Sequence, residues 1–455
     1  MESATADFEF VLNGITVREH AVAPQTTLLD YIRNRGLTGA KEGCAEGECG
    51  ACAVLLLKSA SGNTSTYQSI NSCLVPLPAV SGCEIVTVEA LAESGKLCDV
   101  QREMAQRGGS QCGYCTPGFV VSMFAEQLRA DGRPVDPHNL GGNLCRCTGY
   151  RPIRDAVEAL GAPPDTPLRR RLDQPAPTLL PVHYESAEGK FWRPCSLADC
   201  LELADDDSRF VAGNTDLGVM TNLRHQRFRH LVSLEGIPEL RVFEDGPDHV
   251  EIGVGLTLTE IGERWLHAPD VFREWLCLFA SPLIRNRATL GGNLATASPI
   301  GDSAPLLLAL DAELVVASRA GDRTVPLNGF FHGYRQTLLA PGEIIRSIRI
   351  PKPLPEFARF YKVAKRRVDD ISTIAACIAI GADGSARIAF GGVAAVPSRV
   401  MDAESAIAAG DIRTAKDILR RTLHPMSDHR GSAEYRLAMA CSLVDKFFWE
   451  RGQSK

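Results

Sequence analysis

The sequence predicts a multidomain protein of the α+β class, and three observations support this. The chain has 455 residues, which is more than one hydrophobic core normally organises. Strand-like alternation and helix-like apolar stripes occupy separate blocks along the chain. Two proline-rich stretches, 161–181 and 350–370, interrupt these blocks. We therefore predict domains over 1–90, 91–162, 185–352 and 353–455, with a linker over 163–184.

The composition is that of a soluble globular protein, with 45% hydrophobic and 23% charged residues. The net charge of −6 gives no indication of nucleic-acid binding. The N-terminus MESATADFEF has neither a basic start nor an apolar core, so it is not a secretory signal. No stretch reaches the roughly 20 apolar residues of a membrane helix. A cytoplasmic protein is expected, whose 15 cysteines form no disulfides.

The first block alternates over residues 7–20 around Asn13-Gly14, which predicts a β-hairpin. The stretch TTLLDYIRNRG predicts a helix that ends just before Gly36. CAVLLL and EIVTVEAL predict further strands. A helix packed on a small mixed sheet is therefore expected over 1–90.

The second block is helical. Thr116 is expected to cap one helix, with Pro117 at its first position, and Arg151-Pro152 to open another. Beyond the linker, strands and helices alternate, as in FVAGNTDLG and HLVSLEGI. Over the last block, TIAACIAIGADGSARIAFGGVAA predicts strands, and AESAIAAG, TAKDILRRTL and SAEYRLAMACSLVDKFFWE predict helices.

One set of cysteines has the spacing Cys44-x4-Cys49-x2-Cys52, followed by Cys73. This is the plant-type spacing of a [2Fe–2S] cluster. Gly43, Gly47 and Gly50 let the backbone wrap closely around such a cluster. A zinc loop is the alternative, but zinc sites usually present two halves of the CxxC kind. The spacing therefore favours the cluster.

A second set pairs Cys112-x2-Cys115 with Cys145-x-Cys147. Each pair precedes a predicted helix start, where free N–H groups and the helix dipole stabilise anionic thiolates. From spacing alone an iron–sulfur cluster is favoured, and a zinc site stays possible.

Two loops rich in small polar residues, FVAGNTDLG and TLGGNLATASP, could present successive N–H groups to a pyrophosphate. Each loop taken alone could equally be an ordinary turn. The chain has neither G-x-G-x-x-G nor a Walker A motif, so Rossmann and P-loop nucleotide sites are not indicated.

Both cysteine sets in this order resemble the iron–sulfur region of the molybdenum hydroxylases, the xanthine dehydrogenase/aldehyde oxidase family. The matching stretches are GCAEGECGAC with Cys73, QCGYCTPGFVVS and NLCRCTGYRPI. Past the linker, the resemblance to the same family continues over FVAGNTDLG, SPLIRNRATLGGNLATASPIGDSAP, GYRQTLLAPGEIIRSIRIP and FYKVAKRRVDDIS. It implies a plant-type ferredoxin-like β-grasp domain, a helical [2Fe–2S] domain, an α+β FAD-binding domain of the CO dehydrogenase flavoprotein and vanillyl-alcohol oxidase kind, and a C-terminal α+β flavoprotein domain.

The resemblance also implies roles for individual residues. The implied FAD contacts are Phe210, Val211, Ala212, Gly213, Asn214, Thr215, Asp216, Leu217, Phe279, Thr289, Leu290, Gly291, Gly292, Asn293, Asp302, Ile345 and Lys362. Gln111 is expected to reach the pterin cofactor of a partner subunit. Asp369 is expected to modulate the flavin and its acceptor, for which we favour NAD. Val368 stands where the animal enzymes have glutamate, which leaves details of this loop open.

The resemblance further implies an electron-transfer chain, similar to the small subunit of two-subunit bacterial members of the family. Xanthine and hypoxanthine would be hydroxylated to urate at molybdenum on a large partner subunit, in an α2β2 heterotetramer. Electrons would pass through both clusters to FAD and NAD, and no acid, base or nucleophile is assigned here. Another N-heterocycle or an aldehyde could replace xanthine. A zinc-stabilised assembly module without a redox role is a third reading.

Overall fold

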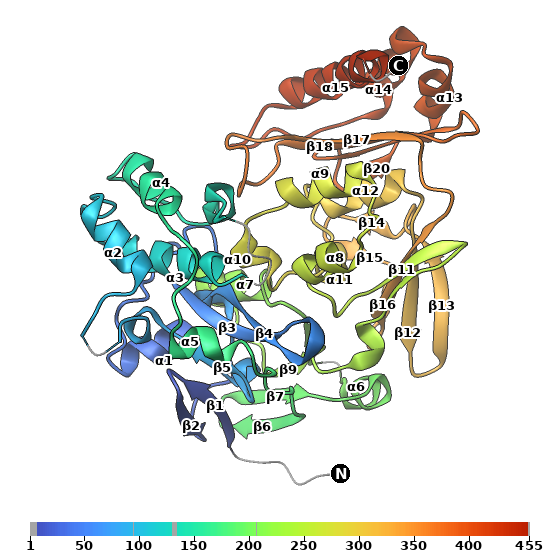
Figure 1. The fold of residues 1–455 in the computed structure, drawn as a ribbon. Coiled ribbons are helices and arrows are strands. Elements are labelled where there is room, and N and C mark those ends of the chain that lie inside the picture. Colours follow the sequence, from blue (N-terminus) through green and yellow to red (C-terminus); the bar gives the residue numbers. More distant parts are fainter. Residues whose placement is uncertain (1–6, 94, 130–133, 206, 454–455) are drawn as a thin grey trace. The chain divides into compact units, whose positions relative to one another are not determined.

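The computed structural model describes residues 7–93, 95–129, 134–205 and 207–453. The N-terminal residues 1–6, on which part of the expectation about secretion rests, lie outside the described residues. The chain divides into two compact units, Met1–Ile237 with Ser281–Ala288, and Pro238–Ala280 with Thr289–Lys455 (Figure 1). The first unit therefore takes in a short segment from much later in the sequence.

The first unit begins with a five-stranded mixed sheet in the order β2-β1-β5-β3-β4. Strands β1 and β5 pair in parallel, and the other pairs are antiparallel. The predicted hairpin is confirmed, with Asn13 and Gly14 both at positive φ. The elements are β1 (Phe8–Leu12), β2 (Ile15–Glu19), α1 (Leu28–Asn34), β3 (Ala53–Ser59), β4 (Ser65–Asn71) and β5 (Glu84–Val86).

In this block the predicted helix is confirmed, whereas the last predicted strand is shorter than expected. Helix α1 forms as predicted, with Gly36 at φ 85° just past its end. The strand expected over EIVTVEAL ends at Val86, and a 3₁₀ turn follows over Val88–Ala90. The alternating pattern continues past Val86, but the pairing with β1 and β3 stops there, so hydrogen-bonding partners and not the pattern set the strand end.

The helical domain consists of α2 (Asp99–Gln106), α3 (Thr116–Gln127) and α4 (Arg151–Glu158). Thr116 is the first residue of α3 rather than its cap, because Cys115 holds the cap position and the Thr116 hydroxyl bonds Ser110 Oγ at 2.8 Å. Buried residues of α3 pack into one core with Leu55 and Leu57 of β3. The helical domain is thereby fixed to one face of the first sheet.

The predicted linker contains a short helix, α5 (Pro167–Arg171). The Thr166 side chain accepts from the Arg169 N–H at 3.1 Å and caps this helix. Leu172 is 5% exposed in the core beneath α3, and Arg171 Nε lies 3.0 Å from Glu84 Oε2. Contacts with the first sheet therefore order this part of the linker.

A second sheet in the first unit has the order β6-β7-β9-β8, from β6 (Val182–Ser186), β7 (Gly189–Arg193), β8 (Ser208–Val211) and β9 (His230–Ser233). It shares a core with the first sheet, where the rings of Phe8 and Tyr184 lie 5.0 Å apart. Arg193 is fully buried and donates to the carbonyls of Ala79 and Ser81 at 3.1 and 2.7 Å. Helices α6 (Leu197–Leu203), α7 (Leu217–Arg224) and α10 (Pro282–Arg285) complete the unit.

The second unit contains a five-stranded sheet in the order β10-β11-β16-β12-β13. Its strands are β10 (Phe243–Asp245), β11 (His249–Gly253), β12 (Glu313–Ser318), β13 (Gly321–Pro326) and β16 (Ile344–Pro351), and the short strands β14 (Phe331–Gly333) and β15 (Gln336–Thr337) pair separately. Its helices are α8 (Leu258–Arg264), α9 (Asp270–Leu278), α11 (Leu290–Ala295) and α12 (Ser303–Ala309).

The last part of the second unit is an antiparallel sheet of β17 (Phe357–Val363), β18 (Ile374–Ile380), β19 (Ala386–Gly391) and β20 (Ser398–Arg399). Helices α13 (Met401–Ala409), α14 (Ile412–Thr422) and α15 (Ala433–Gln453) cover one face of it (Figure 1). Helices α9 and α12 contact the same sheet. The predicted strands and helices of this block are confirmed.

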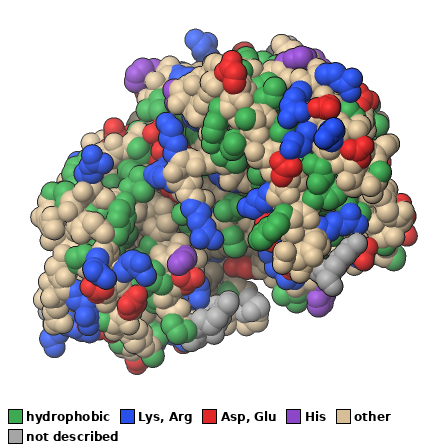
Figure 2. All heavy atoms as spheres, turned by 90° about the horizontal axis from the view of Figure 1, so that it is seen from above, with side chains coloured by type: hydrophobic (Ala, Val, Ile, Leu, Met, Phe, Trp, Pro, Cys, Tyr) green, Lys and Arg blue, Asp and Glu red, His purple; other side chains and the backbone are tan. Residues whose placement is uncertain are grey.

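None of the helices in the described part of the chain is long and apolar enough to cross a membrane. On the face drawn in Figure 2, basic and acidic side chains are interspersed, with hydrophobic side chains scattered between them.

Candidate redox centres and flavin loops

The first cysteine set lies in the first unit, on the loop between α1 and β3 and just after β4. Cys52 Sγ and Cys73 Sγ are 3.4 Å apart, and both residues are buried. The thiols of Cys44 and Cys49 form a second hydrogen-bonded pair. The fold thus brings together four thiols separated by up to 29 positions in the sequence, and it arranges them as two pairs.

The loop stabilises negative charge on these sulfurs. A hydrogen bond from Cys49 lowers the pKa of Cys44 to about 5, against the effect of burial, and the N–H groups of Glu46, Cys49 and Glu48 add to it. Cys73 lowers the pKa of Cys52 in the same way, whereas the pKa values of Cys49 and Cys73 are raised. In each pair, hydrogen bonds thus favour the thiolate form of one sulfur, which is the form that binds a metal.

Glycine is required at the positions that the sequence singled out. A Cβ on Gly43 would lie 2.8 Å from Cys49 Sγ. Gly50 has φ 64°, and a Cβ there would lie 2.4 Å from the carbonyl oxygen of Gly142. Any larger residue at either position would displace the thiol or the neighbouring loop.

The second set also forms two pairs, Cys112 with Cys147 and Cys115 with Cys145. Cys112 and Cys147 are exposed, whereas Cys145 is buried. The N–H of Tyr114 and the thiol of Cys147 lower the pKa of Cys112. Burial raises the pKa of Cys115 to about 12, and the pKa of Cys147 is raised by Cys112. As in the first set, the pKa of one thiol in each pair is lowered and that of the other is raised.

Helix ends and side chains near them support the second set. Cys115 occupies the N-cap position of α3, although its side chain makes no capping hydrogen bond. Burial acts to raise the pKa of Cys145, but hydrogen bonds from Thr148, Cys147 and Cys115 together lower it, and the Thr148 hydroxyl and N–H lie 3.1 Å and 3.5 Å from Cys145 Sγ. Tyr150, at φ 67° before α4, accepts from the Cys145 N–H at 3.0 Å. Thr148 was not predicted, although its position three residues after Cys145 could have indicated it.

The two cysteine loops contact each other through their backbones. The Cys49 carbonyl accepts from the N–H of Leu144 at 3.0 Å, one residue before Cys145. The Gly50 carbonyl accepts from Asn143 Nδ2 at 3.3 Å. A Cβ on Gly118 of α3 would lie 2.1 Å from that same carbonyl oxygen. One backbone hydrogen bond thus connects the predicted ligand Cys49 to Leu144, the residue before the predicted ligand Cys145.

The arrangement of the thiols in pairs distinguishes a site for a single zinc ion from a site for a two-iron cluster. Within the described residues, no group of three or more Cys, His, Asp or Glu side chains is arranged to hold one ion. A structural zinc ion needs four ligands converging on a single point. Two pairs of thiols suit a binuclear centre with two thiolates on each metal. Both sets therefore fit a [2Fe–2S] cluster better than zinc.

The first predicted flavin loop lies in the first unit. It leaves β8, turns at Gly213 and Asn214, and enters α7, so that Phe210–Leu217 span the turn between strand and helix. A Cβ on Gly213 would lie 1.9 Å from the Arg287 carbonyl oxygen, so a side chain has no room there. Asn214 has φ 61° and donates from Nδ2 to the Leu74 carbonyl at 2.6 Å.

The second predicted flavin segment, 289–293, lies in the second unit and is not a loop. Thr289 caps α11 by accepting from the Gly292 N–H at 3.0 Å, and Leu290–Ala295 form the helix. The small residues that suggested a loop allow close packing instead, since a Cβ on Gly291 would lie 2.5 Å from Val254. Asn293 Oδ1 is buried and has no hydrogen-bond partner within the protein, so it can accept from a bound molecule.

Two other predicted flavin residues of the second unit form a buried ion pair. Lys362 Nζ donates to Asp302 Oδ2 at 2.8 Å and to the Leu278 carbonyl at 3.0 Å. Ser372, which the sequence did not indicate, donates to Asp302 Oδ1 at 2.5 Å. These hydrogen bonds hold Asp302 and Lys362 in place. Ser372 is the last residue of KRRVDDIS, so it connects the ion pair to that loop.

The remaining predicted residues have varied surroundings. Phe279 is buried, with its ring 5.3 Å from that of Trp275, and Ile345 is buried on β16. Asp369 is 5% exposed at φ 53°, and its carbonyl accepts from Arg366. Gln111 is exposed beside Cys112, so it is accessible to a partner.

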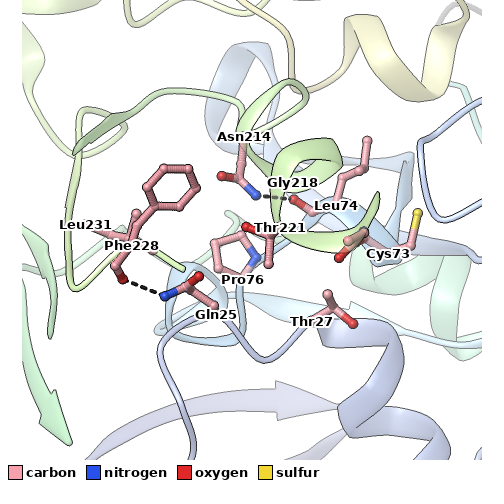
Figure 3. A pocket seen from close by; sticks show the side chains of 11 residues that line it. Gln25, Thr27, Cys73, Leu74, Pro76, Asn214, Gly218, Thr221, Phe228 and Leu231 are labelled. Carbon is pink, nitrogen blue, oxygen red and sulfur yellow. Dashed lines mark hydrogen bonds between the residues drawn. The ribbon is translucent and has the colours of Figure 1, made fainter. Parts of the chain in front are cut away.

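A small pocket that the sequence did not predict lies between α7 and the segment around Cys73 (Figure 3). Asn214 reaches the Leu74 carbonyl at one side of it, and Gln25 donates to the Phe228 carbonyl at the other. A cavity of about 200 Å³ shares Gln25 and Cys73 with this pocket. Helix α7 therefore lies along the wall next to the first cysteine set.

Four family models match consecutive parts of the chain. They describe a 2Fe–2S iron–sulfur cluster binding domain at 10–77, a [2Fe–2S] binding domain at 87–158, an FAD-binding domain in molybdopterin dehydrogenase at 185–353, and a CO dehydrogenase flavoprotein C-terminal domain at 359–450. These matches confirm the predicted α+β fold class, with two [2Fe–2S]-binding domains, an FAD-binding domain and a C-terminal flavoprotein domain.

Among solved structures, a chain of the reconstituted CO dehydrogenase from Oligotropha carboxidovorans is 30% identical with a TM-score of 0.53. The match covers 56% of this chain and 94% of that one. The chain belongs to the molybdenum hydroxylase family. It forms the iron–sulfur and FAD, electron-transferring part of such an oxidoreductase. A chain of quinoline 2-oxidoreductase from Pseudomonas putida 86 is a further match, at 26% identity and a TM-score of 0.53, over 58% of this chain and 96% of that one.

Among curated proteins, the xanthine dehydrogenase of Emericella nidulans is 32% identical over 96% of this molybdenum hydroxylase chain. The match covers 38% of that protein, so the chain spans less than half the length of the curated relatives it matches.

Proposed function

We propose that Cys44, Cys49, Cys52 and Cys73 bind one [2Fe–2S] cluster and that Cys112, Cys115, Cys145 and Cys147 bind a second. The observation that carries this is the arrangement of each set as two thiol pairs. The backbone N–H groups around Cys44, and Thr148 at Cys145, are donors that stabilise a negative cluster. The two metal-binding domains that match the family models contain these cysteines.

For FAD we propose the residues that the resemblance implied, in each unit separately. In the first unit, Phe210–Leu217 offer a tight turn followed by the start of α7. In the second unit, the start of α11 at Thr289–Asn293 offers the buried oxygen Asn293 Oδ1, which has no hydrogen-bond partner within the protein. The pair of Asp302 and Lys362, with Phe279 and Ile345, completes the proposed set. The domain boundaries 1–90, 91–162, 185–352 and 353–455 are proposed on the same basis.

When bound, the clusters and the flavin supply one-electron and two-electron transfer, and the chain's own residues hold them and set their surroundings. The hydrogen bond from Leu144 to the Cys49 carbonyl fixes the distance between the two cysteine loops. Asp369 of KRRVDDIS is proposed to modulate the flavin and its acceptor. Gln111, exposed beside Cys112, is proposed to reach the pterin of a partner.

For the whole assembly we propose an NAD-dependent xanthine dehydrogenase, in which a large molybdopterin-binding subunit hydroxylates xanthine and hypoxanthine to urate. The supporting observation is the match to a xanthine dehydrogenase over 96% of this chain. An α2β2 heterotetramer in the cytoplasm belongs to the same proposal. The likeness to quinoline 2-oxidoreductase favours another N-heterocycle as the second candidate substrate.

The test is to purify the native complex through this chain, to add xanthine and NAD, and to follow NADH and urate. Formation of both products supports the substrate, the acceptor and the partner together. Flavin reduction by quinoline but not by xanthine would show that the substrate is another N-heterocycle. Rapid oxygen reduction without NADH would replace the acceptor. Substantial zinc without acid-labile sulfide would overturn the proposal for the cysteines.

A further inference from the structure

The segment that surrounds Cys44 contains a strained residue. Ala45 has φ 57°, a left-handed conformation that is costly for a residue with a Cβ. The peptide that follows places the Glu46 N–H 3.5 Å from Cys44 Sγ. The strain therefore serves to aim a donor at a sulfur, and something must hold the loop in this conformation.

Asn222 of α7 supplies the contact that holds it. Its Nδ2 donates to the carbonyls of Ala45 and Cys73, each at 2.8 Å. One amide group has two N–H bonds, so a single side chain fixes both chain segments that carry the first cysteine set. Asn222 also lines the pocket and the adjoining cavity, as Cys73 does.

The geometry of a peptide explains why this contact reaches the sulfur. The Ala45 carbonyl and the Glu46 N–H belong to one planar trans peptide, in which they point in opposite directions. Fixing the carbonyl on Asn222 therefore fixes the N–H on Cys44. Donation to the carbonyl also polarises the peptide and strengthens its N–H as a donor.

We infer that Asn222 is a positioning residue for the first cluster, which it affects through the peptide Ala45–Glu46 and the carbonyl of Cys73. This inference rests on the proposed binding of a [2Fe–2S] cluster by Cys44, Cys49, Cys52 and Cys73. Hydrogen bonds to the sulfurs favour the more negative, reduced cluster. Asn222 thus raises the reduction potential of the first cluster and leaves that of the second unchanged.

Asn214 extends the same contact to the other end of α7. Its Nδ2 donates to the Leu74 carbonyl, next to Cys73. Both asparagines come from the FAD-binding domain, and both hold backbone that belongs to the ferredoxin domain. The turn proposed to contact FAD and the loop around the first cluster are therefore attached to one helix.

The experiment is a potentiometric titration, followed by electron paramagnetic resonance, of the full chain in its native complex. The first-cluster signal is identified as the one that Cys52→Ser abolishes. Asn222→Leu removes both donors at similar volume. We expect it to move the first-cluster signal to lower potential and to leave the second where it is.

Asn286→Leu is the matched control. Asn286 Nδ2 also donates to a backbone carbonyl of the ferredoxin domain, that of Ser69 at 2.8 Å, but this carbonyl flanks no cysteine. We expect both potentials to stay unchanged in this variant. If Asn222→Leu does not fold, Asn222→Ser takes its place, since one hydroxyl replaces two donors and a smaller downward shift is expected.

Three outcomes decide the matter. An unchanged first-cluster potential in the Asn222 variants overturns the positioning role while the clusters stand. Equal shifts of both clusters overturn it as well, because they indicate a general disturbance. Absence of [2Fe–2S] signals from the unmodified chain refutes the proposed function itself, which separates the two failures.

Discussion

Cys52 is 2% exposed, and its sulfur lies 3.4 Å from that of Cys73 in the interior of the first domain. A serine hydroxyl is far less acidic than a thiol and is a much weaker ligand for iron, so Cys52→Ser is expected to abolish the first cluster alone. Iron should fall from roughly four to roughly two atoms per chain, since each [2Fe–2S] cluster holds two. Iron and acid-labile sulfide analysis measures this. Cys195→Ser, at an exposed cysteine, is the control and should keep its iron; full iron in Cys52→Ser would refute the assignment.

His230 gives the first unit a dependence on pH near neutrality. Burial lowers its pKa, although Asp205 acts in the opposite direction, and its side chain is 4% exposed. Below the unfolded pKa of about 6.5 the unfolded chain takes up a proton that folded His230 does not. Stability contributed by this residue is therefore present above about pH 6.5 and falls as pH drops toward the lower folded pKa.

We expect His230→Asn to flatten the fall in unfolding temperature between roughly pH 6.5 and 5. Thermal unfolding at a series of pH values measures this slope. His424→Gln, at an exposed histidine, should keep the wild-type slope. An unchanged slope in His230→Asn would show that other groups titrate in this range.

At this scale the sequence was informative wherever spacing encodes chemistry. The eight cysteines could be named because x4, x2 and x spacings limit which thiols can converge. Ser372 and Asn222 could not, since each bonds a group 70 or 149 positions away, which no local pattern reveals.

Helix α3 packs more tightly than its sequence suggests. A glycine inside a helix normally costs about 1 kcal/mol relative to alanine, so Gly118→Ala would be expected to stabilise it. A Cβ on Gly118 would instead meet the Gly50 carbonyl oxygen at 2.1 Å. We expect Gly118→Ala to destabilise the protein by about 1–3 kcal/mol through this overpacking.

Gly452→Ala in α15 is the matched control, because nothing lies within 4 Å of a Cβ there. Thermal unfolding should show a lower midpoint for Gly118→Ala, and an unchanged or slightly higher one for Gly452→Ala. A stabilised Gly118→Ala variant would contradict the close approach of α3 to the first cysteine loop.

Elements were predictable where one local pattern decides them, as in the hairpin at Asn13-Gly14. The predictions missed or misassigned an element where tertiary contacts determine the local structure. The linker forms α5 because Leu172 is buried in a core and Arg171 forms an ion pair with Glu84. The proline-rich sequence of the linker gives no indication of either contact. TLGGNLATASP begins as helix α11 rather than a loop, because Thr289 caps the helix and Gly291 packs against Val254.

At the scale of the whole molecule, segments assigned to different domains along the sequence share a hydrophobic core. Buried residues of the second sheet, including Tyr184 and Phe191, share one core with Phe8 and Leu28 of the first. Arg193 donates across the same boundary to the carbonyls of Ala79 and Ser81. The iron–sulfur part and the start of the FAD-binding domain therefore fold as one body.

A chain cut between Pro177 and Thr178, where both residues are partly or fully exposed, should not come apart. We expect coexpressed fragments 1–177 and 178–455 to copurify at equal stoichiometry, since they share a buried core. Size-exclusion chromatography with a tag on one fragment measures this. Arg193→Leu should reduce recovery of the pair, because it leaves buried carbonyls unpaired. Fragments that elute separately with Arg193 intact would refute the shared core.

The strap Ser281–Ala288 has a consequence for how the protein is made. Asn286 bonds the Ser69 carbonyl, and Leu283 fills part of the core under α3, yet both are translated long after the cysteines. Domains generally fold in order of synthesis as they leave the ribosome. The first unit must instead wait with an unfinished core until residue 288 has emerged, so its closure is a late event in biosynthesis.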